Sequence, residues 1–251
     1  MAQFETVRYS IRDDVAGISL ARPDKRNAIN ERMFNELGDA TELAAHDPSV
    51  RAVVVSGEGP SFCAGIDLGS LAELPGITAA RFRSFVSKAQ RPFRTLVQME
   101  KPAIAAVQGH AVGAGFQLAL ACDLRVAAPD ASFAMQEVRY GLIPDLGGSH
   151  RLTRIVGTAR AKELVWTGRQ VGAEEALAMG LVNHLATDRD LDAETDRLLQ
   201  AILAHSPIPQ GLAKGLIDRA HETSFDLELD REAEAQATVL RKSHSGLPTR
   251  R

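Results

Sequence analysis

Cysteine is scarce in this sequence of 251 residues, and several features that mark particular protein classes are missing. The two cysteines, Cys63 and Cys122, are too few for a disulfide framework or a closed zinc site. No apolar run approaches the roughly 20 residues of a membrane-spanning helix, and the first residues lack the apolar stretch of a signal peptide. These absences predict a cytoplasmic protein with reduced thiols and no membrane partner.

An excess of charge of one sign is also missing. The formal net charge is −3, and the lysines and arginines are spread along the chain, so there is no electrostatic reason to expect a nucleic-acid partner. No Gly-Lys-Ser or Gly-Lys-Thr occurs, which excludes a P-loop nucleotide site, and no group of His, Asp and Glu has metal-ligand spacing. We therefore expect no nucleic-acid partner, no bound metal and no resident cofactor.

Short β-rich runs alternate with helical stretches over the first 150 residues or so. The pattern predicts strands at 15–20, 52–56, 103–107 and 124–127, and helices at 30–45, 78–99 and 115–121. Farther along, the pattern is mostly helical, with helices predicted at 158–167, 173–179, 191–205 and 224–241. The alternation predicts the α/β class. We expect a β-rich core over residues 1–190 and a helical subdomain over residues 191–251.

Two loops rich in small residues are the strongest candidates for a functional site. Residues 56–68 leave a predicted strand, and residues 108–117 follow another strand and open an apolar helix. Small residues let a ligand approach backbone N–H groups closely. Unpaired N–H groups at a helix N-terminus also suit a developing negative charge. Taken singly, however, each loop is more typical of an ordinary tight turn.

Taken together and in this order, the loops resemble the signatures of a known family. Residues 62–68, Phe-Cys-Ala-Gly-Ile-Asp-Leu, and residues 108–123 are similar to two motifs of the crotonase (enoyl-CoA hydratase/isomerase) superfamily. Three further segments resemble that family in the same order, at residues 20–28, 141–152 and 173–182. The resemblance implies a crotonase-type ββα spiral core, with its acyl-CoA site in residues 1–190, and a C-terminal helical subdomain.

The resemblance also implies an acyl-CoA thioester as substrate, so that coenzyme A enters as part of the substrate. Members of the family hold the thioester enolate in an oxyanion hole of two backbone N–H groups, which fall here on Ile66 and Ala114. The family's CoA contacts fall on Lys25, Arg26, Ala64, Asp67 and Leu68. Lys25 and Arg26 can face the CoA phosphates, although ordinary solvated charges on a turn would look the same in sequence.

The catalytic positions depart from the family's hydratases, which use two glutamates. One of these positions is Glu137, a candidate general base. The other is Gln117, whose amide has no proton to exchange and can only orient a water or a carbonyl group. Asp145 follows eight residues after Glu137. In family members that move double bonds, an aspartate here takes part in proton transfer; alternatively, Asp145 caps the helix beginning near Gly147.

These positions favour an enoyl-CoA isomerase. Glu137 would remove a proton from C2 of a β,γ-unsaturated thioester, and Glu137 or Asp145 would return it at C4. The alternative is an enoyl-CoA hydratase with Gln117 as a positioning group, and a third possibility is a protein that binds acyl-CoA without turnover. Because the family usually forms trimers, residues 191–251 are expected to mediate a homotrimer or a dimer of trimers.

Overall fold

The computed structural model describes residues 4–72, 76–187 and 190–242. Within these ranges the larger sheet has six strands in the spatial order β1 (Val7–Arg12), β2 (Val15–Leu20), β3 (Ala52–Gly57), β4 (Ala103–Val107), β6 (Leu124–Ala127) and β9 (His184–Leu185). All neighbouring strands in it are parallel except β1 and β2. The smaller sheet has the order β5 (His110–Val112), β7 (Ser132–Ala134) and β8 (Gln170–Gly172). The α/β class predicted from the sequence is confirmed.

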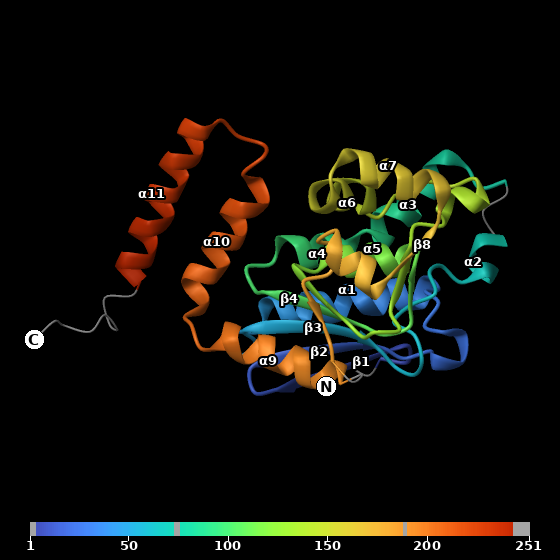
Figure 1. The fold of residues 1–251 in the computed structure, drawn as a ribbon, viewed down its shortest axis with the longest axis horizontal. Coiled ribbons are helices and arrows are strands. Elements are labelled where there is room, and N and C mark those ends of the chain that lie inside the picture. Colours follow the sequence, from blue (N-terminus) through green and yellow to red (C-terminus); the bar gives the residue numbers. More distant parts are fainter. Residues whose placement is uncertain (1–3, 73–75, 188–189, 243–251) are drawn as a thin grey trace, which may run out of the picture.

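Helices surround the larger sheet in layers (Figure 1). In chain order the helical segments are η1 (Pro23–Lys25), α1 (Glu31–His46), α2 (Leu68–Ala72), α3 (Ala79–Ala89), α4 (Arg91–Gln98), α5 (Ala114–Ala121), η2 (Glu137–Tyr140), α6 (Gly148–Val156), α7 (Thr158–Thr167), α8 (Ala173–Ala178), α9 (Leu191–Leu203), α10 (Pro207–Arg219) and α11 (Phe225–Lys242). Helix α1 begins where the sequence predicted, because the Asn30 side chain accepts a hydrogen bond from the Met33 N–H at 2.9 Å.

Apolar side chains on successive strand residues supply two separate cores. Val53 and Val55 of β3 belong to the main core, which α1, α4 and α5 help to form. Ala52 of β3 and Ile104 of β4 face the other way and pack with Leu199 of α9. This division follows from the alternation of side chains along a strand. The larger sheet is therefore covered by helices on both faces.

The helix predicted over residues 78–99 is wrong as a single element. The structure has two helices there, α3 and α4, separated at Gln90. Pro92 lies in the first turn of α4, where its missing N–H costs nothing. Proline would be costly in the middle of a continuous helix. The break matters for the site, because α3 and Gln90 both reach the cavity region described below.

Beyond residue 190, the helices differ in how they attach to the sheets. Helix α9 packs on the larger sheet, whereas α10 and α11 form a hairpin to one side of it (Figure 1). No residue of α11 is buried within the described chain. Of the described helices, none is long and apolar enough to cross a membrane. The domain boundary at 190/191 stays a prediction, and residues 243–251 of the expected helical subdomain lie outside the described residues.

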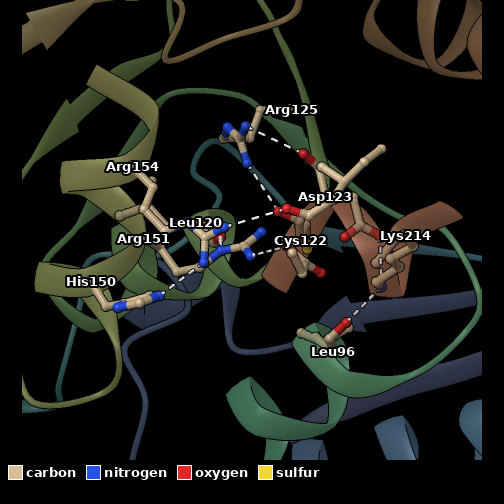
Figure 2. Close-up of polar contacts among 12 residues, drawn as sticks. Leu96, Leu120, Cys122, Asp123, Arg125, His150, Arg151, Arg154 and Lys214 are labelled. Atoms are coloured by element: carbon tan, nitrogen blue, oxygen red, sulfur yellow. Dashed lines mark hydrogen bonds and ion pairs between the residues drawn. The ribbon is translucent and has the colours of Figure 1, made fainter. Parts of the chain in front are cut away.

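Charged side chains of α10 form polar contacts with the core, among them those of Lys214 (Figure 2). The Lys214 ammonium donates to the Asp123 carboxylate at 2.8 Å and to the carbonyls of Leu96 and Lys101 at 3.0 and 3.1 Å. A second ion pair joins Arg151 of α6 to Asp218 of α10 at 2.9 Å. The only buried residue of α10 is Gly211. The position of the hairpin therefore depends on these charged contacts.

We expect Lys214→Met to lower the free energy of unfolding by about 3 kcal/mol, because Asp123 would lose the cation that balances its largely buried charge. Urea unfolding followed by circular dichroism measures the change. The matched control is Arg219→Met in the same helix, an exposed side chain with no ion pair in the described chain, which should cost at most about 0.5 kcal/mol. Equal stabilities of the two variants would contradict the role given to Lys214.

Candidate active site

The two small-residue loops meet because of the sheet. Strands β3 and β4 are parallel neighbours, so the loops that follow them leave the same edge. The loops are then joined by backbone hydrogen bonds: the Cys63 N–H donates to the His110 carbonyl at 2.8 Å, and the Val112 N–H donates to the Cys63 carbonyl at 2.9 Å. Together with α3, η2 and residues 141–146, they line a cavity of about 650 Å³.

Both expected oxyanion donors lie at this cavity. Ile66 and Ala114 line it, and their backbone N–H groups donate to no acceptor in the part of the chain that the structure describes. Ala114 is the first residue of α5, so its N–H lies at the positive end of the helix dipole. Such a pair of free donors can stabilise negative charge that develops on a carbonyl oxygen.

Two glycines allow the donor segments and Glu137 to approach each other. Gly65 has φ +100°, and a Cβ there would lie 2.9 Å from the Val112 carbonyl oxygen. Gly113 has φ +52°, and its added Cβ would lie 3.4 Å from Oε1 of Glu137. Both backbone conformations disfavour a side chain. The Glu137 carboxylate is consequently placed beside the segment that presents the Ala114 N–H.

Glu137 is held at the cavity with one carboxylate oxygen paired. Its Oε1 accepts a hydrogen bond from Nε2 of Gln117 at 2.7 Å, and its buried Oε2 has no partner among the described residues. Burial raises the pKa of this carboxyl group, the Gln117 hydrogen bond opposes the rise, and the Asp145 charge adds to it. A carboxylate of raised pKa with a free oxygen suits a general base.

Gln117 lies where the sequence predicted, but its amide contacts Glu137 and the protein backbone. Its Oε1 accepts hydrogen bonds from the N–H groups of Leu146 and Gly148 at 2.9 and 3.0 Å. The side chain is only 2% exposed, although it also lines the cavity. The expectation that Gln117 orients a water or a substrate carbonyl stays a prediction.

Asp145 lines the same cavity as Glu137, and the alternative that it caps a helix is wrong. Helix α6 begins at Gly148, its N-cap residue is Gly147, and no side chain caps it. Burial raises the pKa of Asp145. Its backbone carbonyl accepts a hydrogen bond from the Gln90 side chain at 2.6 Å. The turn after η2 thus brings a second carboxyl group to the site.

The residues expected to contact CoA lie mostly along one part of the cavity wall. Lys25, Ala64, Asp67 and Leu68 line the cavity, and the Leu68 side chain is 64% exposed. Arg26 is not among the lining residues; its carbonyl accepts a hydrogen bond from the Ala64 N–H at 2.9 Å. The CoA-binding roles of all five remain predictions.

Asp67 is committed to contacts within the protein. Its carboxylate pairs with the Arg22 guanidinium at 2.9 Å and accepts from the Gly69 N–H at 3.0 Å. The Gly69 N–H and Arg22 together hold its pKa below the usual range. Arg22 also donates to the carbonyl of Ala28. Asp67 therefore fixes the first loop against the segment that follows β2.

Sequence reasoning missed several residues that shape this site. Asn27 is fully buried and donates to the Glu58 and Ser61 carbonyls, both at 2.8 Å, so it braces the first loop. No periodic pattern points to it. Phe82, Phe85 and Val86 of α3 line the cavity, and their helical spacing is a signal that could have identified them.

Other reactive groups near the loops are not suited to nucleophilic chemistry. The Cys63 thiol is buried, and burial raises its pKa to about 12. A thiol of that pKa stays protonated near neutral pH. Within the described ranges, no group of three or more His, Cys, Asp or Glu side chains could hold a metal ion. Of the carboxyl groups that line the cavity, Asp67 is paired with Arg22, which leaves Glu137 and Asp145 as the candidates for acid–base chemistry.

Comparison with known proteins gives a consistent result. The family model described as enoyl-CoA hydratase/isomerase matches residues 10–247. The chain is 35% identical to the crotonyl-CoA hydratase of Syntrophomonas wolfei over 233 residues, covering 92% of this chain and 88% of that protein. It is 36% identical to the short-chain-enoyl-CoA hydratase of Clostridium acetobutylicum over 222 residues, covering 88% and 84% of the two chains.

Solved structures agree with these sequence matches. A Thermobifida fusca protein crystallised in complex with CoA superposes with a TM-score of 0.88 at 35% identity, covering 96% of this chain and 95% of that chain. An enoyl-CoA hydratase from Bacillus anthracis superposes with a TM-score of 0.88 at 32% identity, covering 94% and 92%. The crotonase-type fold expected from the motifs is confirmed, and the chain belongs to the enoyl-CoA hydratase/isomerase family.

Proposed function

We propose that the protein converts enoyl-CoA thioesters through an enolate, and that its main reaction is hydration of the α,β double bond. The observation that carries the proposal is the presence of two carboxyl groups, Glu137 and Asp145, on the wall of one cavity with two free backbone N–H donors. The names of the relatives, which are those of hydratases, support hydration over the double-bond migration that the sequence alone ranked first.

Different surroundings give the two carboxyl groups different roles. Glu137 accepts a hydrogen bond from Gln117, which favours its ionised form. Asp145 has no such side-chain donor, and burial raises its pKa. The repulsion between the two charges also favours the state in which only one is ionised. We assign Glu137 as the base, because its free Oε2 lies beside the segment that presents the Ala114 N–H, and Asp145 as the acid.

In this mechanism Glu137 takes a proton from water while the water oxygen bonds to C3 of the enoyl group. The C2–C3 π electrons move toward the thioester, and the enolate oxygen is held by the N–H groups of Ile66 and Ala114. Asp145 then gives its proton to C2, which forms the 3-hydroxyacyl thioester. A proton passes from Glu137 to Asp145 through solvent and restores both groups.

Double-bond migration is the second candidate, and Gln117 is the observation that favours it. The family's hydratases carry a glutamate at that position, and an amide cannot exchange a proton there. Glu137 alone can take a proton from C2 of a β,γ-unsaturated thioester and return it at C4. The same cavity and the same donor pair serve this reaction. It differs from hydration in its substrate, in adding no water and in needing only Glu137.

The assembly and location of the protein are also proposals. We propose a homotrimer or a dimer of trimers, in the cytoplasm, with the α10–α11 hairpin at the subunit interface. The support is the exposed apolar side chains of α11, including Phe225 at 76% and Leu229 at 47% exposure. Apolar side chains in such number on one helix are typical of a surface that packs against protein.

Substrate conversion tests the proposed function directly. The protein is incubated with crotonyl-CoA and, separately, with the β,γ-unsaturated isomer vinylacetyl-CoA. The products are separated by reversed-phase chromatography against standards of both isomers and identified by mass spectrometry. We expect 3-hydroxybutyryl-CoA from crotonyl-CoA as the faster reaction. Crotonyl-CoA formed from vinylacetyl-CoA without hydration would establish the isomerase instead. Binding without either product would leave a non-catalytic acyl-CoA-binding protein.

Variants of the two carboxyl groups test the mechanism. We expect Glu137→Gln to lower kcat about 100- to 10,000-fold, because the proton acceptor is lost while the shape is kept. Asp145→Asn should lower hydration by a similar factor and affect migration less, because migration needs only Glu137. Isothermal titration with acetyl-CoA checks that both variants still bind a thioester. A kcat near the unmodified value in Glu137→Gln would rule out this base.

Sedimentation velocity at micromolar protein tests the assembly. We expect a species of three or six chains, because each chain has a mass of 27.0 kDa and exposes the apolar side chains of α11. Phe225→Asp together with Leu229→Asp should shift the distribution toward the monomer. A single 27.0 kDa species for the unmodified protein would show that α11 stays with its own chain.

A further inference from the structure

The Gln117 amide joins the two segments that carry the carboxyl groups. Its Nε2 donates to Oε1 of Glu137 in η2 at 2.7 Å. Its Oε1 accepts from the N–H groups of Leu146, the residue after Asp145, and Gly148, three residues after Asp145, at 2.9 and 3.0 Å. Thus a single buried side chain of α5 contacts both segments.

The orientation of this amide follows from its partners. Two backbone N–H groups on one side require an acceptor there, so the carbonyl oxygen faces Leu146 and Gly148 and the NH₂ group faces Glu137. Space is limited as well: a Cβ added at Gly148 would lie 2.6 Å from Cγ and 2.7 Å from Oε1 of Gln117. The glycine leaves a slot in which the amide fits in one orientation.

A second glutamine holds the same turn from another helix. Gln90, at the junction of α3 and α4, donates to the Asp145 carbonyl at 2.6 Å. Gln90 contacts only the Asp145 segment, whereas Gln117 contacts both segments. Any change in the Gln117 amide is therefore passed on to Glu137 and to the Asp145 turn at once.

We propose that Gln117 is a positioning residue whose amide holds the Glu137 carboxylate in its catalytic orientation and fixes it relative to the turn that carries Asp145. This inference rests on the proposed function for its catalytic meaning. It differs from the role expected from sequence, in which Gln117 orients a water or a substrate carbonyl. One carboxylate oxygen of Glu137 is held by the amide, and the other, Oε2, is left for proton transfer.

Besides Gln117, few groups shift the pKa of Glu137. Asp145 is the charged group that raises its pKa, and Gln117 is the side chain that lowers it. Helix α7 packs against η2, and its charged side chains, Arg160, Lys162 and Glu163, do not contribute to the pKa of Glu137. Arg139 on η2 itself donates to the Gly168 carbonyl at 3.0 Å. A change at Gln117 should therefore appear as a change in the pKa of Glu137, with no cation among the described residues that would offset it.

Three variants separate the two contacts of the amide. Gln117→Glu keeps an acceptor for the Leu146 and Gly148 N–H groups but replaces the amide donor to Glu137 with a second carboxyl group. Gln117→Met removes both contacts at similar length. Gly148→Ala keeps the glutamine and pushes its amide out of the slot. The matched control is Gln210→Met in α10, which removes one hydrogen bond to the Ile202 carbonyl far along the chain from the site.

The pH dependence of kcat/KM for crotonyl-CoA is the first readout. A base must be ionised, so activity falls as the pH drops through the pKa of Glu137. Loss of the donor raises that pKa, and we expect the acid limb to move up by about one pH unit in Gln117→Met and Gly148→Ala, the effect of one hydrogen bond to a charged group. In Gln117→Glu we expect a larger upward shift, because a second carboxyl group then faces Glu137. We expect kcat of Gln117→Met to fall on the order of 100-fold through misplacement of the base, with KM close to the unmodified value. Gln210→Met should change neither the position of the acid limb nor kcat.

A second readout does not need turnover. The side-chain carboxyl carbon of Glu137 is followed by ¹³C NMR during a pH titration and is assigned by its absence in Glu137→Gln. We expect a higher Glu137 pKa in Gln117→Glu and Gly148→Ala than in the unmodified protein. Unchanged pKa values, or an unchanged acid limb in an active enzyme, would overturn the positioning role. Inactivity of the unmodified protein on both enoyl-CoA substrates would instead reject the proposed function and leave the NMR result to decide the contact.

Discussion

The parallel pairing of β3 with β4 is the constraint on which the site depends. It brings the ends of both strands to one edge of the sheet, where the loops after them form hydrogen bonds through Cys63, His110 and Val112. Those bonds occupy the neighbouring backbone groups and leave the N–H groups of Ile66 and Ala114 free. The backbone hydrogen bonds between the loops fix the direction of these two N–H groups within the fold, and donors positioned in advance stabilise developing charge effectively.

Burial determines the acid–base properties of the site. The carboxyl groups of Glu137 and Asp145 lie on a mostly apolar cavity wall, and desolvation raises the pKa of each. What distinguishes them is hydrogen bonding, because Gln117 donates to Glu137 and, among the described residues, no side chain donates to the Asp145 carboxylate. The surroundings of the two carboxyl groups thus differ, which is the condition under which groups of the same chemistry can take different roles.

The substitution of glutamine at position 117 has a structural consequence as well as a chemical one. An amide offers a donor and an acceptor together, so it can bridge a carboxylate and two backbone N–H groups in a way that a carboxylate cannot. The family relationship by itself would identify the position as catalytic. The contacts instead indicate a side chain that acts through Glu137, and Asp145 supplies the second ionisable group of the proposed hydration.

The sequence by itself determined the family, the α/β class, four neighbouring strands of the larger sheet (β2, β3, β4 and β6) and the candidate site positions Glu137, Asp145, Ile66 and Ala114. These features depend on local patterns, such as strand alternation and small-residue loops, or on motifs that keep their order along the chain. Only the tertiary structure decided that α3 and α4 are separate helices, that Asp145 lines the cavity rather than capping α6, and that the Gln117 amide faces Glu137. Those outcomes depend on contacts between residues far apart in sequence, such as Gln90 with Asp145, which no local pattern contains.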